Sequence, residues 1–97
     1  MTTVYATDAG GVMRLSVRGH ATGSDQVCAA VSGLVCALAG YLANDDGAQV
    51  QEQVVDSARA VFRFTGGPEA HGAFKAVVIG LQQLAASYPD FIEAGVI

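Results

Sequence analysis

Residues 12–43 read VMRLSVRGHATGSDQVCAAVSGLVCALAGYLA, and within them the spacing of apolar side chains changes from that of a strand to that of a helix. From Val12 to Val17 apolar and polar residues alternate, which predicts a strand with one buried and one solvated face. From about Ser24 to Ala43, small and apolar residues predict a helix. Ser24 or Asp25 can cap it, because either side chain accepts a backbone N–H of the first turn.

The remaining segments predict a hairpin on each side of this helix and a second helix. Gly10 and Gly11 mark the turn of the first hairpin, and Asp56 and Ser57 mark that of the second. Apolar residues spaced three or four apart form one stripe of the second helix: Phe74, Val77, Val78, Leu81, Leu84, Ala85 and Tyr88. The expected elements are strands at Thr3–Thr7, Val12–Val17, Ala48–Val55 and Ala58–Thr65, helices at about Ser24–Ala43 and Glu69–Tyr88, and a short strand in the tail.

The order ββαββα(β) predicts an α+β fold, a mainly antiparallel sheet of four to five strands with two helices packed on it. With 97 residues, the chain is expected to form a single domain over residues 1–97. Apolar residues make up 52% and charged residues 14% of the chain, so little charge is available to cover its surface. We therefore expect a self-association interface.

Charge and segment patterns argue against several classes of partner. The net charge is −4 with five basic residues, a poor footprint for nucleic acid, so a peptide or small molecule is the expected partner. The start of the chain lacks a basic region followed by an apolar stretch, so no signal peptide is expected. Residues 27–43 carry no charge, but their Ala, Gly, Ser and Cys content favours a buried core helix over a membrane span. A cytoplasmic protein is expected, with Cys28 and Cys36 as thiols.

His20 and Cys28 flank the loop between the strand and the first helix. If Asp25 is the cap, Cys28 is the third helical residue, where the helix dipole favours the thiolate over the thiol. The loop is short enough to bring the imidazole of His20 back over the helix start. A nucleophile with an adjacent base is the minimum for thiol acyl transfer, and backbone N–H groups of the helix start can hold the oxyanion. A buried structural cysteine is the alternative interpretation, and spacing alone does not exclude it.

The order of residues around this pair resembles a known family. Gly19-His20-Ala21, Gly23-Ser24-Asp25 and the run VCAAVS over residues 27–32 resemble the signature of the ribosomal-processing cysteine proteases, Prp. In that family, GHA at a strand end is followed by a glycine-rich loop and by G-x-D-x-V-C-A-A-x-S at a helix start. The resemblance extends over the whole chain, including the two hairpins and the LQQL core at residues 81–84.

The resemblance implies a small α/β fold, a homodimer and a cysteine endopeptidase without cofactor. Such enzymes remove a short N-terminal extension from large-subunit ribosomal protein number twenty-seven, after a segment that contains an aromatic residue. Cys28 matches the family's nucleophile and His20 its general base. Asp25 and Ser32 match its signature Asp and Ser. Our expectations are that Asp25 caps the helix and that Ser32 either hydrogen-bonds near the thiol or packs as a small residue. Gly19 and Gly23 leave room for a substrate backbone.

Two departures from the family pattern leave an alternative open. The loop between His20 and Cys28 is several residues shorter than in the family, and Gln26 replaces an aliphatic residue. A short loop restricts lid motion, so a non-catalytic ribosome-associated binding module of the same fold is the second hypothesis. A structural dimer with a packed thiol is the third.

The remaining candidates have simpler interpretations. Cys36 lies two turns beyond Cys28 among apolar residues and is expected to pack in the core. His71 is expected at the exposed first turn of the second helix, without a role. The cysteines and histidines lack ligand spacing, so no metal is expected. Four arginines are assigned to the solvated face of the sheet: Arg14, Arg18, Arg59 and Arg63.

Overall fold

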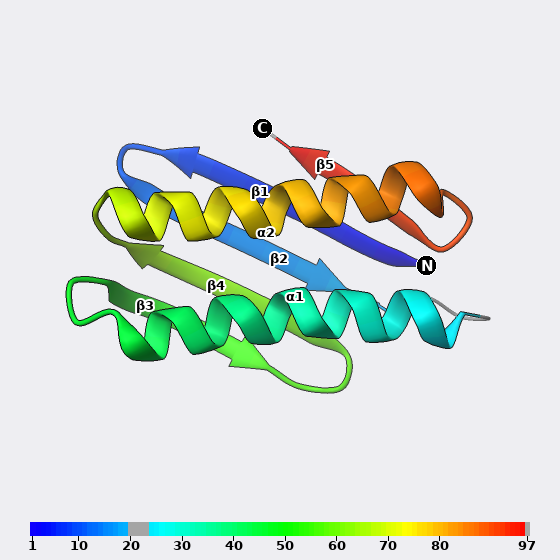
Figure 1. Ribbon diagram of the computed structural model, residues 1–97, viewed down its shortest axis with the longest axis horizontal. Coiled ribbons are helices and arrows are strands. Elements are labelled where there is room, and N and C mark those ends of the chain that lie inside the picture. Colours follow the sequence, from blue (N-terminus) through cyan, green and yellow to red (C-terminus); the bar gives the residue numbers. More distant parts are fainter. Residues whose placement is uncertain (20–23, 97) are drawn as a thin grey trace.

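The computed structural model describes residues 1–19 and 24–96 and shows one five-stranded sheet with two helices (Figure 1). The elements are β1 (Thr2–Ala9), β2 (Val12–Arg18), α1 (Asp25–Asn44), β3 (Gln49–Val55), β4 (Arg59–Thr65), α2 (Pro68–Ser87) and β5 (Ile92–Val96). The predicted order ββαββαβ is therefore confirmed, including the short strand in the tail.

The strands lie side by side in the order β3-β4-β2-β1-β5. Neighbours among the first four are antiparallel, whereas β5 runs parallel to β1, so the sheet is mixed. Ala9 pairs with Val12, which leaves a two-residue turn made of Gly10 and Gly11. Both glycines have positive φ, 62° and 79°, as the type of turn that matches strand twist requires.

Both helices cover the same face of the sheet, and the core lies between the helices and that face (Figure 1). Met13, Leu15 and Val17 of β2 are buried there, as their alternation predicts, and Phe62 and Phe64 of β4 lie beside them. Phe64 contacts Phe74 of α2 edge to face, with ring centroids 5.9 Å apart. Strand alternation thus sends the arginines of β2 and β4 to the opposite face.

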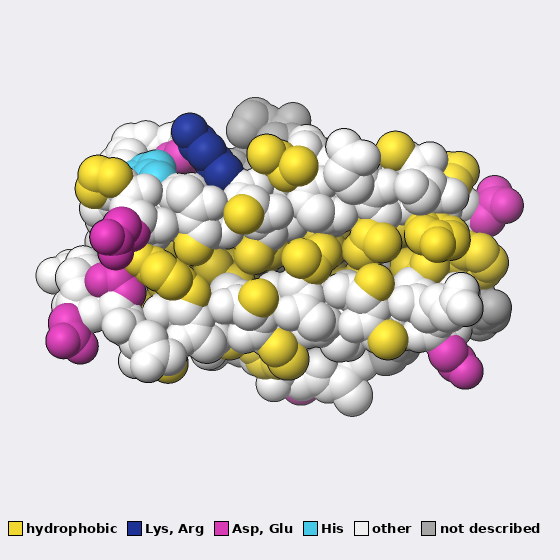
Figure 2. Space-filling view, viewed as in Figure 1, with side chains coloured by type: hydrophobic (Ala, Val, Ile, Leu, Met, Phe, Trp, Pro, Cys, Tyr) yellow, Lys and Arg dark blue, Asp and Glu magenta, His cyan; other side chains and the backbone are white. Residues whose placement is uncertain are grey.

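The two helices contact each other along an apolar seam, which Figure 2 shows from the helix side. Gly80 of α2 faces Leu34 of α1, and a Cβ at Gly80 would lie 3.0 Å from the Leu34 methyl carbons. The glycine inside a helix is explained by this close approach.

One side of α1 packs against the sheet through a regular apolar stripe: Val27, Val31, Val35, Leu38 and Leu42. In the described part of the chain, α1 is the one helix that is long and apolar enough to cross a membrane. Core helices of soluble proteins also meet these two criteria, so they do not identify a membrane span. The other side of α1 is largely exposed.

The helix α2 corrects one expectation about the core. Phe74, Val77, Val78 and Leu81 are buried as predicted, but Tyr88 is 40% exposed. The helix ends at Ser87, and the backbone of Tyr88 leaves the helical conformation at φ −132°. Its side chain therefore no longer follows the stripe that the helical spacing predicts.

Candidate active site

The first turn of α1 determines where Cys28 lies. Ser24 has extended backbone angles, φ −141° and ψ 100°, and its Oγ accepts a hydrogen bond from the N–H of Val27 at 3.2 Å. Ser24, not Asp25, is therefore the cap. Asp25 is the first helical residue, where a carboxylate is favourable because it lies at the positive end of the helix dipole.

Cys28 directly follows Val27, whose N–H is bound by the cap. Its backbone N–H donates to the carbonyl oxygen of Ser24 at 3.2 Å. Val27 before it is buried in the core, whereas Cys28 itself is half-buried at the border between core and surface. Because Ser24 is the cap, Cys28 is the fourth helical residue and not the third, one place further from the positive end of the helix than predicted.

Cys28 lines a pocket of about 170 Å³ between α1, the end of β2 and the β3–β4 turn. The floor is apolar, made of Val17, Val31, Val35 and Ala60, whereas polar groups form the rim. The complete lining is Thr2, Val17, Gly19, Cys28, Val31, Ser32, Val35, Cys36, Val55, Asp56, Ser57, Ala58, Arg59 and Ala60. An apolar floor with a thiol and polar groups at its edge is the usual form of a small-ligand or peptide site.

Gly19 forms the wall where β2 ends. Two features explain why a glycine stands here. Its φ is +83°, and the backbone of Met1 lies so close that a Cβ would be 2.6 Å from the Met1 carbonyl oxygen. Its N–H donates to the carbonyl oxygen of Ala58 at 3.1 Å. This bond joins the end of β2 to the β3–β4 turn, so two walls of the pocket are held together.

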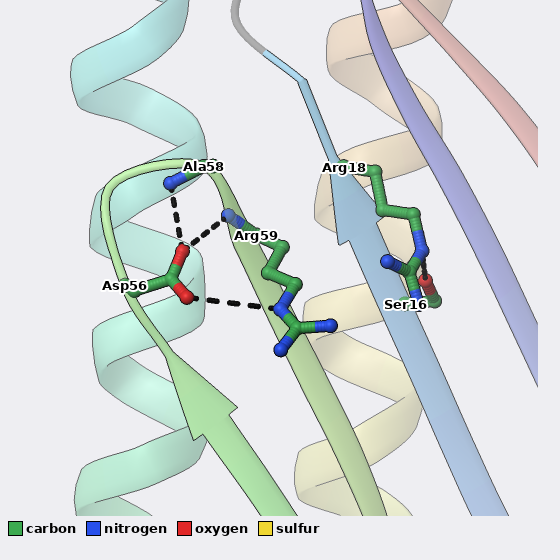
Figure 3. Close-up of polar contacts among 5 residues, drawn as sticks. All are labelled: Ser16, Arg18, Asp56, Ala58 and Arg59. Atoms are coloured by element: carbon green, nitrogen blue, oxygen red, sulfur yellow. Dashed lines mark hydrogen bonds and ion pairs between the residues drawn. The ribbon is translucent and has the colours of Figure 1, made fainter.

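The β3–β4 turn is the part of the site that sequence reasoning missed. Asp56 Oδ1 accepts hydrogen bonds from the N–H groups of Ala58 at 2.8 Å and Arg59 at 3.0 Å, and Oδ2 lies 3.7 Å from Arg59 Nε (Figure 3). The N–H of Ala58 is the main reason why the pKa of Asp56 lies below its ordinary value. The aspartate signals a turn in the sequence, but only the tertiary structure shows that this turn faces Cys28.

Ser32 and Cys36 lie one and two helical turns beyond Cys28 and line the same pocket. Both are exposed. The prediction that Cys36 packs in the core is therefore wrong. Val35 and Leu38 belong to the buried stripe of α1, so the side chain of Cys36 lies on the open side of the helix. Ser32 likewise does not pack as a buried small residue.

Two of the predicted site residues, His20 and Gly23, lie outside the described residues. The residues that flank this segment, Gly19 and Ser24, are the pocket wall and the helix cap. His71 is placed elsewhere: α2 begins at the end of the molecule opposite the start of α1 (Figure 1). Its Nε2 lies 3.6 Å from Asp8 Oδ2, and its Nδ1 lies 3.1 Å from the carbonyl oxygen of Gly67.

The described residues contain no group of three His, Cys, Asp or Glu side chains that could hold a metal ion. The chemistry that they offer at the pocket is that of a thiol beside a helix start. Such a thiol attacks electrophilic carbon, and backbone N–H groups of the helix start can stabilise the negative charge that develops on oxygen. The arrangement suits acyl transfer.

Comparisons with solved structures show which proteins share this fold. The S. aureus ribosomal processing protease Prp, in complex with a covalently linked product peptide, superposes with a TM-score of 0.84 at 20% identity over 100% of both chains. The same protease with a substrate peptide gives 0.75 at 20% identity, again over 100% of both chains. The protein SMU.848 from Streptococcus mutans gives 0.78 at 23% identity and covers 100% of this chain and 94% of its own.

At these identities, the structural likeness establishes the fold. Among curated proteins, no sequence matches the chain significantly. The family described as cysteine protease Prp matches residues 1–93, which include the cap, Cys28, Ser32 and the β3–β4 turn. The chain therefore belongs to the Prp family and is a cysteine protease by class.

Proposed function

We propose that this protein is an endopeptidase that removes the N-terminal extension of large-subunit ribosomal protein number twenty-seven, with Cys28 as nucleophile and His20 as general base. The position of Cys28 carries the proposal: a half-buried thiol in the first turn of α1, at the edge of a pocket with an apolar floor. The S. aureus relatives, with a substrate peptide in one case and a covalently linked product peptide in the other, support a peptide substrate.

In the proposed reaction, the Cys28 thiolate attacks the carbonyl carbon of the scissile peptide bond. The carbonyl oxygen becomes an oxyanion, and the N–H groups of Asp25 and Gln26 are suited to hold it, since the first helical N–H groups have no partner within the helix. The N–H of Val27 is already bound by Ser24 Oγ. In this proposal Asp25 contributes its backbone N–H.

His20 would take the thiol proton and give it to the leaving amine, which breaks the C–N bond and leaves a thioester on Cys28. Water then attacks the thioester, with His20 accepting its proton, and the thiol is restored. His20 directly follows Gly19, a wall of the pocket that Cys28 lines, and this neighbourhood supports the assignment. Ser32 is assigned to the pocket surface one turn further along α1.

The β3–β4 turn is assigned to substrate positioning. Its Asp56 holds the backbone of Ala58 and Arg59, and the N–H of Gly19 ties Ala58 to the strand that precedes His20. A substrate segment between α1 and this turn would place an apolar side chain over Val31 and Val35. A rigid wall of this kind reduces the orientational freedom that must be lost before reaction.

We further propose that the enzyme acts in the cytoplasm as a homodimer. The low charge content and the exposed side of α1 support self-association. Sedimentation at micromolar concentration should give twice the monomer mass of 9.9 kDa.

The test is cleavage of a synthetic peptide that spans the extension and first residues of the ribosomal protein from the same organism. Wild type and the matched control Cys36→Ala are expected to cut it at the same bond, whereas Cys28→Ala and His20→Ala leave it intact. A wild-type protein that binds the peptide without cutting it would instead favour a non-catalytic binding module of the same fold.

A further inference from the structure

The open face of the sheet gathers most of the positive charge of the chain. Four of the five basic residues lie on β2 and β4: Arg14, Arg18, Arg59 and Arg63. Their neighbours along each strand are buried under the helices, so the arginines belong to the opposite face. Figure 3 shows Arg18 and Arg59 in front of the sheet, with both helices behind it.

The strand register brings these arginines together in pairs. Arg14 lies directly opposite Arg63, and Arg18 lies directly opposite Arg59. Like charges at directly opposed positions repel each other, so each pair lowers the stability of the sheet unless an anion lies between or above the two guanidinium groups. Asp56 provides such an anion at Arg59, at 3.7 Å. Arg14 and Arg63 have Glu52 nearby, at the register position of β3 opposite Arg63.

A hollow of about 290 Å³ lies at the Arg14–Arg63 pair. Its lining holds the two arginines and one carboxylate, that of Glu52, together with Tyr5, Thr7, Leu15, Ser16, Val61 and Phe62. Arg63 is half-buried, and within the described part of the chain its Nε is a buried donor without a hydrogen-bond acceptor. A buried donor on a charged group costs free energy until an acceptor arrives, so the hollow is suited to an anionic ligand.

Tyr5 adds an aromatic surface to this hollow. Its side chain is 56% exposed on the central part of the open face, and its register partner is Ser16. An open sheet face with an exposed aromatic ring and flanking arginines is an arrangement on which single-stranded RNA bases stack. Hydroxyl groups of Thr7 and Ser16 can add contacts to phosphate and sugar.

We propose that the open sheet face, defined by Tyr5, Arg14, Arg18, Arg59 and Arg63, binds single-stranded RNA. The choice of RNA over an acidic peptide rests on the proposed function. A ribosomal protein is made to bind ribosomal RNA, so an enzyme that processes one meets its substrate next to RNA. Arg59 also lines the pocket of Cys28, so the face continues to the cleavage site. Three carboxylates also belong to this face, Glu52 and Glu93 on its edge strands and Asp56 beside Arg59, so its four arginines exceed its acidic groups by one charge, against −4 for the whole chain.

The experiment measures anisotropy of a labelled 12-nucleotide oligouridine RNA with the full-length protein, from 50 to 200 mM salt. Each phosphate contact contributes about −0.7 to the slope of log affinity against log salt. Arg14→Gln/Arg18→Gln changes two exposed residues that lie outside the pocket of Cys28, so the variant is expected to fold. It should bind at least tenfold more weakly, with a slope shallower by about 1.4. Lys75→Gln, an exposed cation on α2, is the matched control and should bind as wild type does.

Two further measurements separate RNA binding from peptide cleavage and test the role of the Tyr5 ring. Cys28→Ala should bind RNA like wild type, so loss of cleavage and loss of RNA binding are distinguishable. Tyr5→Phe should retain binding and Tyr5→Ala should weaken it, because the ring provides the stacking surface. The proposal is overturned if wild type shows no binding at 50 mM salt, if the double arginine variant binds equally well, or if a polyglutamate peptide competes as well as RNA. It is also overturned if sedimentation shows that the double variant dissociates a dimer, since a second copy would then cover this face.

Discussion

The backbone N–H of Cys28 donates to the carbonyl oxygen of Ser24 at 3.2 Å, while the Ser24 hydroxyl accepts from Val27. One serine thus fixes both the start of α1 and the position of Cys28 in its first turn. Ser24→Ala removes the cap and is expected to lower the free energy of unfolding by about 1 kcal/mol. For a domain of this size, that corresponds to a melting temperature lower by about 4–8 °C. Urea and thermal denaturation measure the loss, with Ser57→Ala as a control.

Gly19 gives the second prediction. Gly19→Ala forces a side chain into a left-handed backbone conformation, with its Cβ 2.6 Å from the Met1 carbonyl oxygen. Backbone strain of this kind costs about 1–3 kcal/mol, and the pocket wall must also shift. We expect lower stability in urea and slower cleavage in the same variant. The matched control is Gly33→Ala, because Gly33 lies in the exposed part of α1 with open space at its Cβ position. Unchanged stability of Gly19→Ala would show that the wall is not rigid.

The β3–β4 turn gives a prediction about substrate binding. Asp56→Ala removes the acceptor for two backbone N–H groups and for Arg59, so the turn loses its fixed conformation. We expect the KM for the substrate peptide to rise several-fold while kcat falls less, since the role proposed for the turn is to position the substrate and not to contact the reacting atoms. Asp46→Ala, in the turn before β3 at the other end of the molecule, should leave both constants unchanged. A fall in kcat at constant KM would contradict the positioning role.

The C-terminal end of α1 provides a pH-dependent prediction. Tyr41 donates a hydrogen bond to the Asp45 carboxylate, and this bond is the main reason that the pKa of Tyr41 is raised from 10.0 to about 12. Because the folded-state pKa lies above the unfolded one, the stabilisation is fully present below pH 10 and is lost as the pH rises towards 12. Denaturation curves between pH 9 and 12 should therefore show a steeper loss of stability for wild type than for Tyr41→Phe. Tyr88→Phe should follow wild type, and equal slopes for all three proteins would contradict the assignment.

The same bond has an effect at low pH. It is the main reason that the pKa of Asp45 lies below its ordinary value of 3.8. The stabilisation from Asp45 is therefore present above that value and is lost as the pH falls through the folded-state pKa. In Tyr41→Phe, the pKa of Asp45 should move back towards 3.8, so the acid unfolding of that variant should begin at a higher pH.

Much of the fold follows from sequence periodicity. Alternation in residues 12–17 and 60–64 predicts strands with one buried face, and the structure confirms both. The apolar stripe of α2 is also confirmed up to Leu81. The expectations for Tyr88 and Cys36 fail for a shared reason: composition indicates apolar surroundings, but the end of a helix or its rotation against the sheet decides which side chains are covered. Pairing of β5 with β1 is a long-range contact that local patterns do not determine.

The sequence predicts only those parts of the candidate site whose residues lie close together in the chain. The capping residues, Cys28 and the glycine at the strand end lie within ten residues of one another, so the sequence indicates their proximity. Asp56 and Arg59 reach the same pocket from about thirty residues away, because β4 pairs with β2. The sequence likewise assigns the arginines to a solvated face but gives no sign that Arg14 and Arg63 lie directly opposite each other.

The central claim is that Cys28 is activated by its place at the helix start, and the reaction of the two thiols with iodoacetamide at pH 6 tests it most directly. Cys36 is the more exposed of the two, so accessibility alone predicts that it reacts first. Activation predicts the opposite order, because the thiolate is the reactive form. We expect peptide mapping by mass spectrometry to find Cys28 modified well before Cys36. Faster modification of Cys36, or reaction of Cys28 only after denaturant is added, would contradict the account.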